Sequence, residues 1–351
     1  PHRWELAGGG QYNQVRHPYS DNSYYFIYIG SDVAPLRIQT ATAIDTPADT
    51  LIDNYDYRDC YENDLKNLVW GGQRWYGEEF DVNLSQNFNF TIPNVSPSPV
   101  TVKVTYASSA RTSGNQIVVQ KSGQTIGQMT MPHTGSYFQR GTLTCMDLNP
   151  SAALNLNITV NRLNPNVITY LDRILIQGQR SLSLVGSQIN FRVADWSQGL
   201  SIAAYQLSNI GANAFVWDLS DRHNPLQVPI QFQNGQPLIK TNAEYREFVL
   251  ASGNAYFTPE RVGGVVSQNL HQLPLADYLI VTHPEFTAQA NRLADLHREE
   301  GLSVHVVPVQ AIYNEFSSGM QDPGAIRRFA KMFYDRALQT DPSLRPKYLL
   351  L

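Results

Sequence analysis

The sequence is poor in cysteine and in charge. Cys60 and Cys145 are the only cysteines among 351 residues, too few for a disulfide-built scaffold or a structural zinc site. Charged residues make up only 16% of the chain and the formal net charge is −4, whereas nucleic-acid binding asks for a basic face. No apolar run approaches the roughly 18 residues of a membrane-spanning helix. The composition therefore argues against a disulfide scaffold, a nucleic-acid-binding protein and a transmembrane protein.

The first residues also lack the pattern of a signal peptide. Residues 1–6 show no basic start followed by an apolar stretch, which is how such a leader begins. The chain starts at Pro1 and not at a methionine. We therefore expect a piece of a longer protein, with any signal peptide upstream. At 351 residues, 42% of them hydrophobic, the chain exceeds the usual size of a single core and should form two or three domains.

Residues 1–180 are predicted to form an antiparallel β-sandwich or jelly roll. Apolar and polar residues alternate in several runs, which places one face of each strand in a core and the other in water. Turn residues such as Ser122-Gly123 separate the runs, and short strands at this spacing are typical of a sandwich. The clearest runs are Phe88–Ile92, Val100–Tyr106 and Leu154–Val160.

The part of this domain that precedes Phe88 holds two further predicted elements. Tyr24–Ile29 is predicted as a strand, and Glu62–Trp70 as a short helix. We attach this part of the chain to the sandwich instead of giving it a core of its own.

Residues 181–260 are predicted as a second, smaller β unit. Ile189–Val193 and Ala214–Trp217 continue the β character. Asn234-Gly235 lies between two apolar runs and predicts a hairpin. Tyr245–Leu250 supplies another strand.

Residues 261–351 are predicted to begin an α/β domain. Tyr278–Val281 is a continuous apolar run, typical of a strand covered on both faces. Val304–Val307 is a second strand, and Tyr348–Leu351 begins a third. Strands that alternate with helices predict a parallel sheet with helices on both faces. Because a central strand at the last residue is no natural domain end, we expect the sheet to continue in the parent protein.

Two helices are predicted between these strands. The first carries one apolar stripe and has Gly301 just past its end. The second has Asp322 as its cap and Pro323 at its first position. The stripes consist of Phe286, Ala290, Leu293 and His297 in the first helix and of Ile326, Phe329, Ala330 and Phe333 in the second.

Short segments of the chain carry a family resemblance. In the last part they are Ala276–Val281, Gly301–Val304, Val306-Val307, Ile312–Ser317, Gly319, Asp322-Pro323, Ala325–Arg327 and Tyr348–Leu351, and upstream they are Gly72–Glu78 and Val216–Asp221. In order and spacing, the segments of the last part resemble the opening of the gingipain-type cysteine peptidase domain. The upstream segments are similar to the PorU-like branch of that family, the sortases of the type IX secretion system.

The resemblance implies a caspase-like α/β cysteine endopeptidase with a Cys–His dyad and no cofactor. The sortase branch is taken to remove the C-terminal signal domain from secreted cargo proteins and to transfer the cargo to a lipopolysaccharide anchor. Its implied partners are such cargo and other secretion-system components, and its implied location is the outer membrane or cell surface. In the family both dyad residues follow later strands of the sheet. We therefore assign no catalytic, cofactor-binding or metal-ligating residue to this chain, and we expect it to be inactive alone.

The two cysteines are interpreted as structural. Cys145 lies in a predicted strand without a glycine-rich turn around it, which favours a buried thiol over a nucleophile. Cys60 has Asp59 and Glu62 among its acidic neighbours, and their negative field should raise its thiol pKa. A Cys60–Cys145 disulfide is possible in an exported parent, but the sequence does not give their separation.

Two histidines are weighed as candidates for chemistry. His283 follows the strand Tyr278–Val281, at the end where open α/β sheets place ligands, and Glu285 is near enough to partner it. No cysteine or serine nearby completes a nucleophile pair, so we favour a loop residue at the start of a helix. His305, inside a strand, is interpreted as a packed or edge histidine.

Two further groups are considered as binding sites. Asp218 and Asp221 could bind calcium through oxygen ligands, but no EF-hand spacing is present and a solvated turn is favoured. Trp70, Trp75 and Tyr76 could form a sugar-binding platform, but packing is the commoner use of such aromatic residues.

Two other functions stay open beside the peptidase. The first is a carbohydrate- or protein-binding β-sandwich module of a surface protein, which would explain the sandwich but not the α/β part after Pro274. The second is a docking platform for other secretion components, for which the sequence shows no specific patch.

Overall fold

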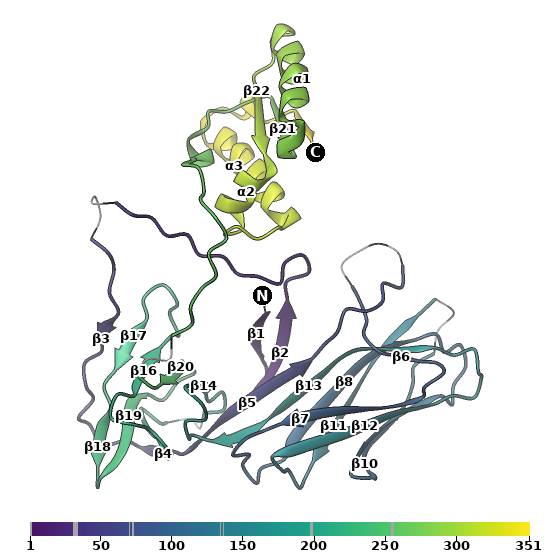
Figure 1. The fold of residues 1–351 in the computed structure, drawn as a ribbon, viewed down its shortest axis with the longest axis vertical. Helices are drawn as coiled ribbons and strands as arrows, with labels where there is room; N and C mark the ends of the chain where they lie inside the picture. The colour runs from purple at the N-terminus through teal and green to yellow at the C-terminus, as the bar shows by residue number, and fades with distance from the viewer. Residues whose placement is uncertain are drawn as a thin grey trace. The chain divides into compact units, whose positions relative to one another are not determined.

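The computed structural model describes residues 2–30, 34–69, 71, 74–133, 135, 137–196, 199–253 and 256–351. The chain divides into two compact units (Figure 1). The α/β unit consists of Pro1–Arg3, Arg16–Ala34 and Pro259–Leu351, and the β unit of Trp4–Val15 and Pro35–Thr258. No helix among the described residues has the length and apolar character needed to cross a membrane.

The β unit contains the predicted antiparallel sandwich. One sheet has the order β10-β9-β12-β7 and the other the order β11-β8-β13-β5, with β6 beside β13. Alternate side chains such as Val102 and Val104 of β8 are fully buried between the sheets, as the alternation in the sequence predicts. The strands are β5 (Asn54–Tyr61), β6 (Glu79–Phe80), β7 (Ser85–Thr91), β8 (Val100–Ser108), β9 (Gln116–Lys121), β10 (Gln124–Thr130), β11 (Gln139–Asp147), β12 (Ala153–Asn161) and β13 (Thr169–Ser181).

A second β core lies in the same unit. Its sheets have the orders β14-β20-β16-β17-β3 and β18-β19-β15-β4, and they enclose Phe191, whose ring stacks on Phe248 at 4.9 Å. The predicted hairpin is confirmed, since Asn234 and Gly235, both at positive φ, join β18 to β19. The strands are β3 (Gln39–Thr40), β4 (Thr50–Ile52), β14 (Gln188–Arg192), β15 (Ile202–Gln206), β16 (Phe215–Asp218), β17 (Leu226–Val228), β18 (Gln231–Gln233), β19 (Gln236–Asn242) and β20 (Glu247–Ala251).

A buried ion network joins the sandwich to this second core. Arg58 of β5 donates to Glu247 of β20 at 2.9 Å, and the Arg192 Nε atom lies 3.8 Å from the same carboxylate. Asp56 accepts from the Tyr12 hydroxyl at 2.9 Å and from the backbone N–H of residue 194 at 2.7 Å. Both arginine side chains are more than nine-tenths buried, so the carboxylate between them balances charge that is largely shielded from water.

Two predictions for the early part of the chain are wrong. Tyr24–Ile29 is no strand, because it has no strand partner among the described residues. The described part of Glu62–Trp70 is no helix, because Lys66 bridges to the backbone of Tyr76 instead. Trp70 itself lies outside the described residues.

The assignment of this early part to the sandwich is also only partly right. β5 and β6 do pair with β13 of the sandwich. In contrast, β3 and β4 add as parallel edge strands to β17 and β15 of the second core, and Arg16–Ala34 belongs to the α/β unit.

An N-terminal hairpin was not predicted. It consists of β1 (His2–Ala7) and β2 (Gln11–Arg16), joined by a turn with Gly9 and Gly10 at positive φ. The side-chain amide of Gln177 in β13 pairs with both the N–H and the carbonyl of Tyr12. One side chain thus replaces a strand partner for β2 at this point.

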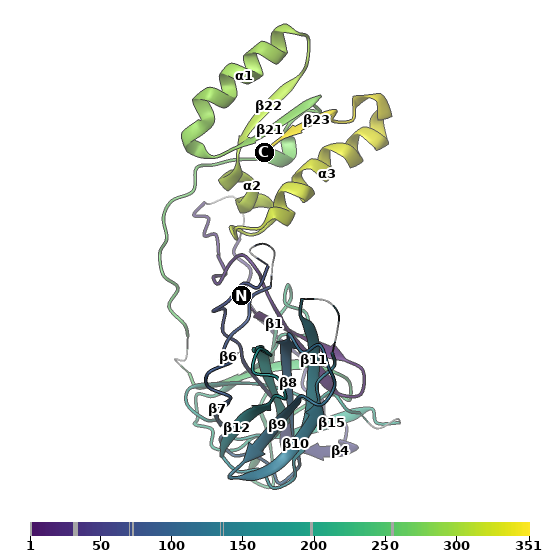
Figure 2. The same ribbon diagram turned by 90° about the vertical axis from the view of Figure 1, so that its right-hand side faces the viewer.

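The α/β unit contains the predicted parallel sheet. β21 (Tyr278–Thr282) lies between β22 (Val304–Pro308) and β23 (Tyr348–Leu350), and both pairings are parallel. Helix α1 (Thr287–Glu299) covers one face through Ile280 and Ala294. Helices α2 (Val309–Phe316) and α3 (Pro323–Thr340) cover the other (Figure 2).

The ends of these helices follow the sequence signals. The Asp322 side chain accepts from the N–H of Gly324 at 2.7 Å, with Pro323 at the first position of α3. Gly301, at a φ of +89°, follows the end of α1. Helix α2 was not predicted. Short 3₁₀ helices occur at η1 (Leu270–Gln272), η2 (Pro284–Phe286) and η3 (Pro342–Leu344).

Candidate functional site

The carboxyl end of β21 is the place where an open α/β sheet would hold a ligand. His283 follows this strand, and its Nδ1 atom accepts from the backbone N–H of Glu285 at 3.4 Å, which caps η2. The Glu285 carboxylate lies 3.8 Å from Nδ1, and both side chains are more than half exposed. No hydrogen bond joins His283 to a cysteine or serine side chain within the described residues. The geometry therefore agrees with a capping loop residue.

His305 is packed, as the sequence analysis favoured. Its Nε2 atom lies 2.9 Å from the carbonyl oxygen of Pro274, and its ring is 5.9 Å from that of Phe333 in α3. It lies on the face of β22 that α2 and α3 cover, and not at the carboxyl end of the sheet.

The amino ends of all three parallel strands meet at one carboxylate. Asp277, just before β21, accepts from the Ser303 hydroxyl at 2.7 Å and its N–H at 3.0 Å, and pairs with Lys347 at 2.8 Å. The bond from Lys347, and then those from Ser303, hold the pKa of Asp277 far below its usual value, and the pKa of Lys347 is raised in turn. Asp277 therefore fastens the strand starts, on the edge opposite to His283.

A second carboxylate holds residues 268–271, which lead into the parallel sheet of the α/β unit. Glu315 of α2 accepts from Gln268 and from the N–H of Leu270, both at 2.8 Å, and its carboxylate lies 2.7 Å from the Nδ1 atom of His271. Burial alone would raise the pKa of Glu315, but these contacts outweigh it and lower the pKa.

Asp277 and Glu315 were missed as anchoring residues. A sequence signal existed for the first, since Asp277 and Ser303 each stand directly before a predicted strand of one parallel sheet. Parallel strands start at the same edge of a sheet, and these two side chains could therefore have been placed together. No comparable signal connects Glu315 to residues more than forty positions earlier in the chain.

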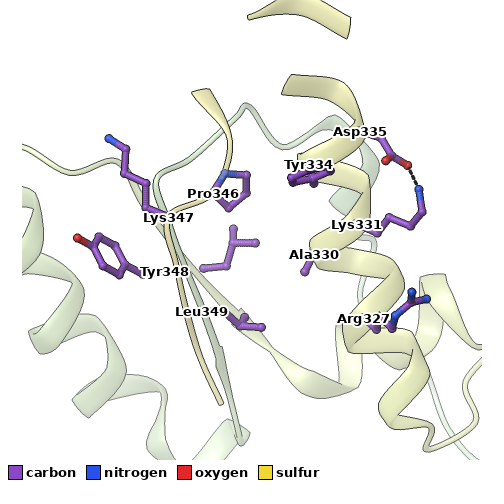
Figure 3. Close-up of a pocket in the computed structure, with 10 residues that line it drawn as sticks. Arg327, Ala330, Lys331, Tyr334, Asp335, Pro346, Lys347, Tyr348 and Leu349 are labelled. Carbon is purple, nitrogen blue, oxygen red and sulfur yellow. Dashed lines mark hydrogen bonds and ion pairs between the residues drawn. The ribbon is translucent and has the colours of Figure 1, made fainter. Parts of the chain in front are cut away.

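A cavity of about 420 Å³ lies between α3 and the edge strand β23 (Figure 3). Its rim carries the ion pair of Lys331 with Asp335. The lining residues are Leu279, Arg327, Ala330, Lys331, Tyr334, Asp335, Pro346, Lys347, Tyr348 and Leu349. None of them is a cysteine, serine or histidine, so the lining offers neither the thiol nor the imidazole of a Cys–His dyad.

The two cysteines are both free thiols. Cys145 is buried in the sandwich core, where burial and then Asp147 raise the pKa of its thiol to about 11. For Cys60, burial and then Glu62 raise it to about 12. The predicted direction for Cys60 is confirmed, although burial outweighs the acidic neighbours. Both thiols are therefore held in the unreactive protonated form.

A disulfide between them is excluded by their strands. Cys60 lies on β5 and Cys145 on β11, at opposite edges of the sheet β11-β8-β13-β5. Three strand intervals correspond to about 14 Å, whereas the Cα atoms of a disulfide lie within about 7 Å.

The candidate calcium ligands are engaged within turns. Asp218 accepts from the N–H and hydroxyl of Ser220 and pairs with Arg246 at 2.5 Å. Asp221 accepts from the N–H of His223 at 2.9 Å and from the side chain of residue 224 at 2.8 Å. Across the part of the chain that the structure describes, no group of three or more His, Cys, Asp or Glu side chains could hold a metal ion.

One member of the candidate aromatic platform, Tyr76, is not available to a sugar. Tyr76 is buried and packs with Ala107 and Tyr170, while Trp75 is partly exposed and Trp70 lies outside the described residues. Tyr76 therefore serves packing and offers no open ring face to a sugar.

Comparison with known families gives one match. Residues 271–351 match peptidase family C25. This segment begins within η1 and spans the parallel sheet and the helices α1, α2 and α3 of the α/β unit. No curated protein sequence matches the chain.

Among solved structures, one match covers the whole chain. The chain is similar to dimeric latent PorU from Porphyromonas gingivalis, with a TM-score of 0.84 and 23% identity over 100% of this chain and 34% of that one. The chain thus spans about a third of the length of that structure. A CBM36-1 domain of a xylanase from the hindgut metagenome of Trinervitermes trinervoides covers 35% of this chain and 98% of its own at 12% identity, but its TM-score of 0.26 is too low to indicate a shared fold. Residues 271–351 thus carry a segment of peptidase family C25, the gingipain family, and the chain has the fold of the matching third of PorU.

Proposed function

We propose that the chain is the N-terminal accessory region and the opening of the catalytic domain of a gingipain-like cysteine endopeptidase. The observation that carries the proposal is the parallel sheet β22-β21-β23 with helices on both faces, which lies within the segment that matches family C25. The likeness of the entire chain to PorU supports the proposal that the β unit is the accessory region of such a peptidase.

On this proposal the dyad lies in later strands of the parent protein. The reaction needs a thiolate activated by an imidazole, with backbone N–H groups to hold the oxyanion. The raised pKa values of Cys60 and Cys145 and their place in the sandwich argue against either as the nucleophile. We accordingly assign no catalytic, cofactor-binding or metal-ligating residue to this chain.

We further propose that the parent is a sortase that removes C-terminal signal domains from secreted cargo at the cell surface. Its partners would be that cargo and other secretion-system components, and it would be exported with a signal peptide upstream of this chain. Residues 1–180 and 181–260 would shape the approach of cargo and brace the catalytic domain that begins at 261. The support is the likeness to PorU and the absence of a membrane-spanning helix among the described residues.

The test compares this chain with the full-length product of its gene. Both are incubated with a protein that carries a C-terminal signal domain, and cleavage is followed by mass spectrometry. We expect the full-length protein, once activated, to release the domain in a reaction that a cysteine-directed inhibitor stops, and this chain to release nothing. Inhibitor-sensitive cleavage by this chain would contradict our placement of the dyad.

The alternative of a sugar-binding module gains no support from its proposed residues. Its platform needs open ring faces, and Tyr76 is buried. We therefore propose no second function.

A further inference from the structure

The segment that connects the β unit to the α/β unit is open along its length. Residues 256–267 are all exposed, and they form neither helix nor strand. The backbone of residues 257–267 has no hydrogen-bond partner on the backbone of another residue that the structure describes. A Cβ atom added at Gly263 or Gly264 would meet nothing within 4 Å. The backbone of this segment is therefore accessible to another molecule.

Both ends of this open segment are held, each by its own unit. In the β unit, the ring of Tyr256 stacks on that of Phe215 with 5.9 Å between the ring centres. In the α/β unit, Gln268 donates to the Glu315 carboxylate at 2.8 Å. These contacts hold the chain on either side of residues 257–267 and leave the stretch between them free.

Arg261 lies near the middle of the free stretch. It is the only lysine or arginine between Arg246 and Arg292, and it is followed by Val262, so no proline blocks the bond. An endopeptidase binds its substrate as an extended strand, through the backbone as well as the side chains. Exposed segments whose backbone is not hydrogen-bonded are the preferred sites of nicking. A peptidase that selects arginine would therefore find a suitable bond here.

Two other exposed arginines show why exposure alone is not enough. Arg37 stands two residues before β3, which is paired with β17. Arg222 lies in a turn in which Asp221 accepts from the N–H of His223 at 2.9 Å. Binding of a peptidase would first have to open these bonds, and the cost of that opening lowers the rate of cutting.

We propose that the bond between Arg261 and Val262 is a cleavage site for an endopeptidase that selects arginine, and that the cut protein remains one particle of two chains. Water adds across the peptide bond, so that the C–N bond breaks, Arg261 gains a carboxylate and Val262 gains an α-ammonium group. The two chains are residues 1–261 and 262–351. The modification is separate from the peptidase activity proposed above and does not depend on it.

The segment Arg16–Ala34 explains why the two chains should stay together. It precedes the cut, yet it belongs to the α/β unit, most of which follows the cut. Atoms of Tyr24 and Phe26 lie 3.1 and 3.3 Å from the place where a Cβ atom of Gly319 would stand. The first chain would thus keep its contacts to the second chain after the peptide bond is hydrolysed.

Limited proteolysis of this chain with trypsin, followed by intact-mass spectrometry over time, tests the cleavage site. We expect the first cut after Arg261. The substitution Arg261→Gln should slow the loss of intact chain at least about tenfold, because cutting elsewhere requires local opening. Arg37→Gln is the matched control and should leave the rate unchanged. A first cut elsewhere, or an undiminished rate with Arg261→Gln, would overturn the cleavage site.

Size-exclusion chromatography of the cut protein tests the two-chain particle. In native buffer both fragments should elute together at the volume of the uncut chain, and in urea they should separate. The double substitution Tyr24→Ala and Phe26→Ala should weaken their association at least about tenfold, since it removes ring contacts at Gly319. Ile27→Ala, at a side chain that is 83% exposed in the same segment, should leave the association unchanged. Separate elution in native buffer, or equal effects of the two variants, would overturn the two-chain particle.

These readouts are distinct from the test of the proposed function. A chain that resists trypsin at Arg261 refutes the cleavage site, whatever the full-length product does to peptides. A full-length product without peptidase activity refutes the proposed function and leaves the cleavage site standing.

Discussion

The two units of the molecule differ in how completely they cover their strands. In the β unit, β8 alternates buried and half-buried residues, and Val100, Val102 and Val104 are fully covered by the facing sheet. In the α/β unit, every residue of β23 is exposed although the strand is as apolar. The β unit thus buries the apolar faces of its strands within its own two cores. In the α/β unit, β21 is mostly buried. It lies between β22, whose residues are buried or half-buried, and β23, whose residues are exposed.

This difference shows in which unit the apolar surface is covered and in which unit it is exposed. Burial of apolar surface is the main favourable term of folding, so the β cores should resist unfolding on their own. The exposed strand β23 and the bare segment Tyr24–Ile29 belong to the α/β unit. Substitutions in the two units should therefore have effects of very different size.

The largest effect is expected in the second β core. Phe191→Ala removes a fully buried ring that contacts Phe248, Tyr205 and Tyr55. The cavity and lost contacts should cost about 4 kcal/mol of unfolding free energy, measured by urea unfolding. Phe232→Ala, at an exposed site of the same core region, should cost less than about 0.5 kcal/mol. Equal costs would show that the second core is not packed as described.

The second-largest loss of unfolding free energy is expected in the ion network between the β cores. Glu247→Gln leaves the buried side chains of Arg58 and Arg192 without their shared counter-charge, which should cost about 3 kcal/mol. Glu79→Gln, whose partner Lys66 is more than half exposed, should cost less than about 1 kcal/mol. Similar unfolding midpoints for the two variants would contradict the role given to Glu247.

A matched pair of leucines tests the contrast within the parallel sheet. Leu279 of β21 and Leu349 of β23 are register partners, but they are 1% and 47% exposed. Leu279→Ala should cost about 3 kcal/mol, and Leu349→Ala less than about 1 kcal/mol, as followed by the exchange rates of amides in β21. If the second substitution matched the first, β23 would be covered in solution.

The smallest effect concerns Asp277 and its dependence on pH. Asp277→Asn should cost about 1 kcal/mol near neutral pH, because it weakens the contacts to Ser303 and Lys347. Since folding lowers the pKa of Asp277, its stabilisation is present above the unfolded pKa, about 4, and is lost as the pH falls. The gap in stability between the two proteins should therefore narrow steadily as the pH falls below about 4, the unfolded pKa. A gap that widens in acid would refute this account.

Local signals in the sequence predicted the fold where local physics decides it. Asn234-Gly235 and Asp322-Pro323 specify a turn and a helix start through their own backbone and side-chain preferences, and both are confirmed. The apolar run Tyr278–Val281 predicted a strand covered on both faces, and α1 and α3 cover it.

Predictions from the sequence were wrong or missing where contacts between residues far apart in the chain determine the structure. Tyr24–Ile29 has the composition of a strand but no neighbour among the described residues, and Glu62–Trp70 is held by a bridge to Tyr76. The pairing of β4 with β15 joins residues about 150 positions apart, which no periodicity reveals. The absence of site residues and the boundaries 1–180, 181–260 and 261–351 stay predictions.

The central proposal is that the parent of this chain is a cysteine peptidase whose nucleophile lies outside residues 1–351. The most direct measurement treats the activated full-length product with a thiol-reactive substrate analogue and maps the modified residue by mass spectrometry. The account predicts one rapidly labelled cysteine that follows Leu351 in the parent sequence, with Cys60 and Cys145 unmodified. Rapid labelling of Cys60 or Cys145, with loss of activity, would contradict it.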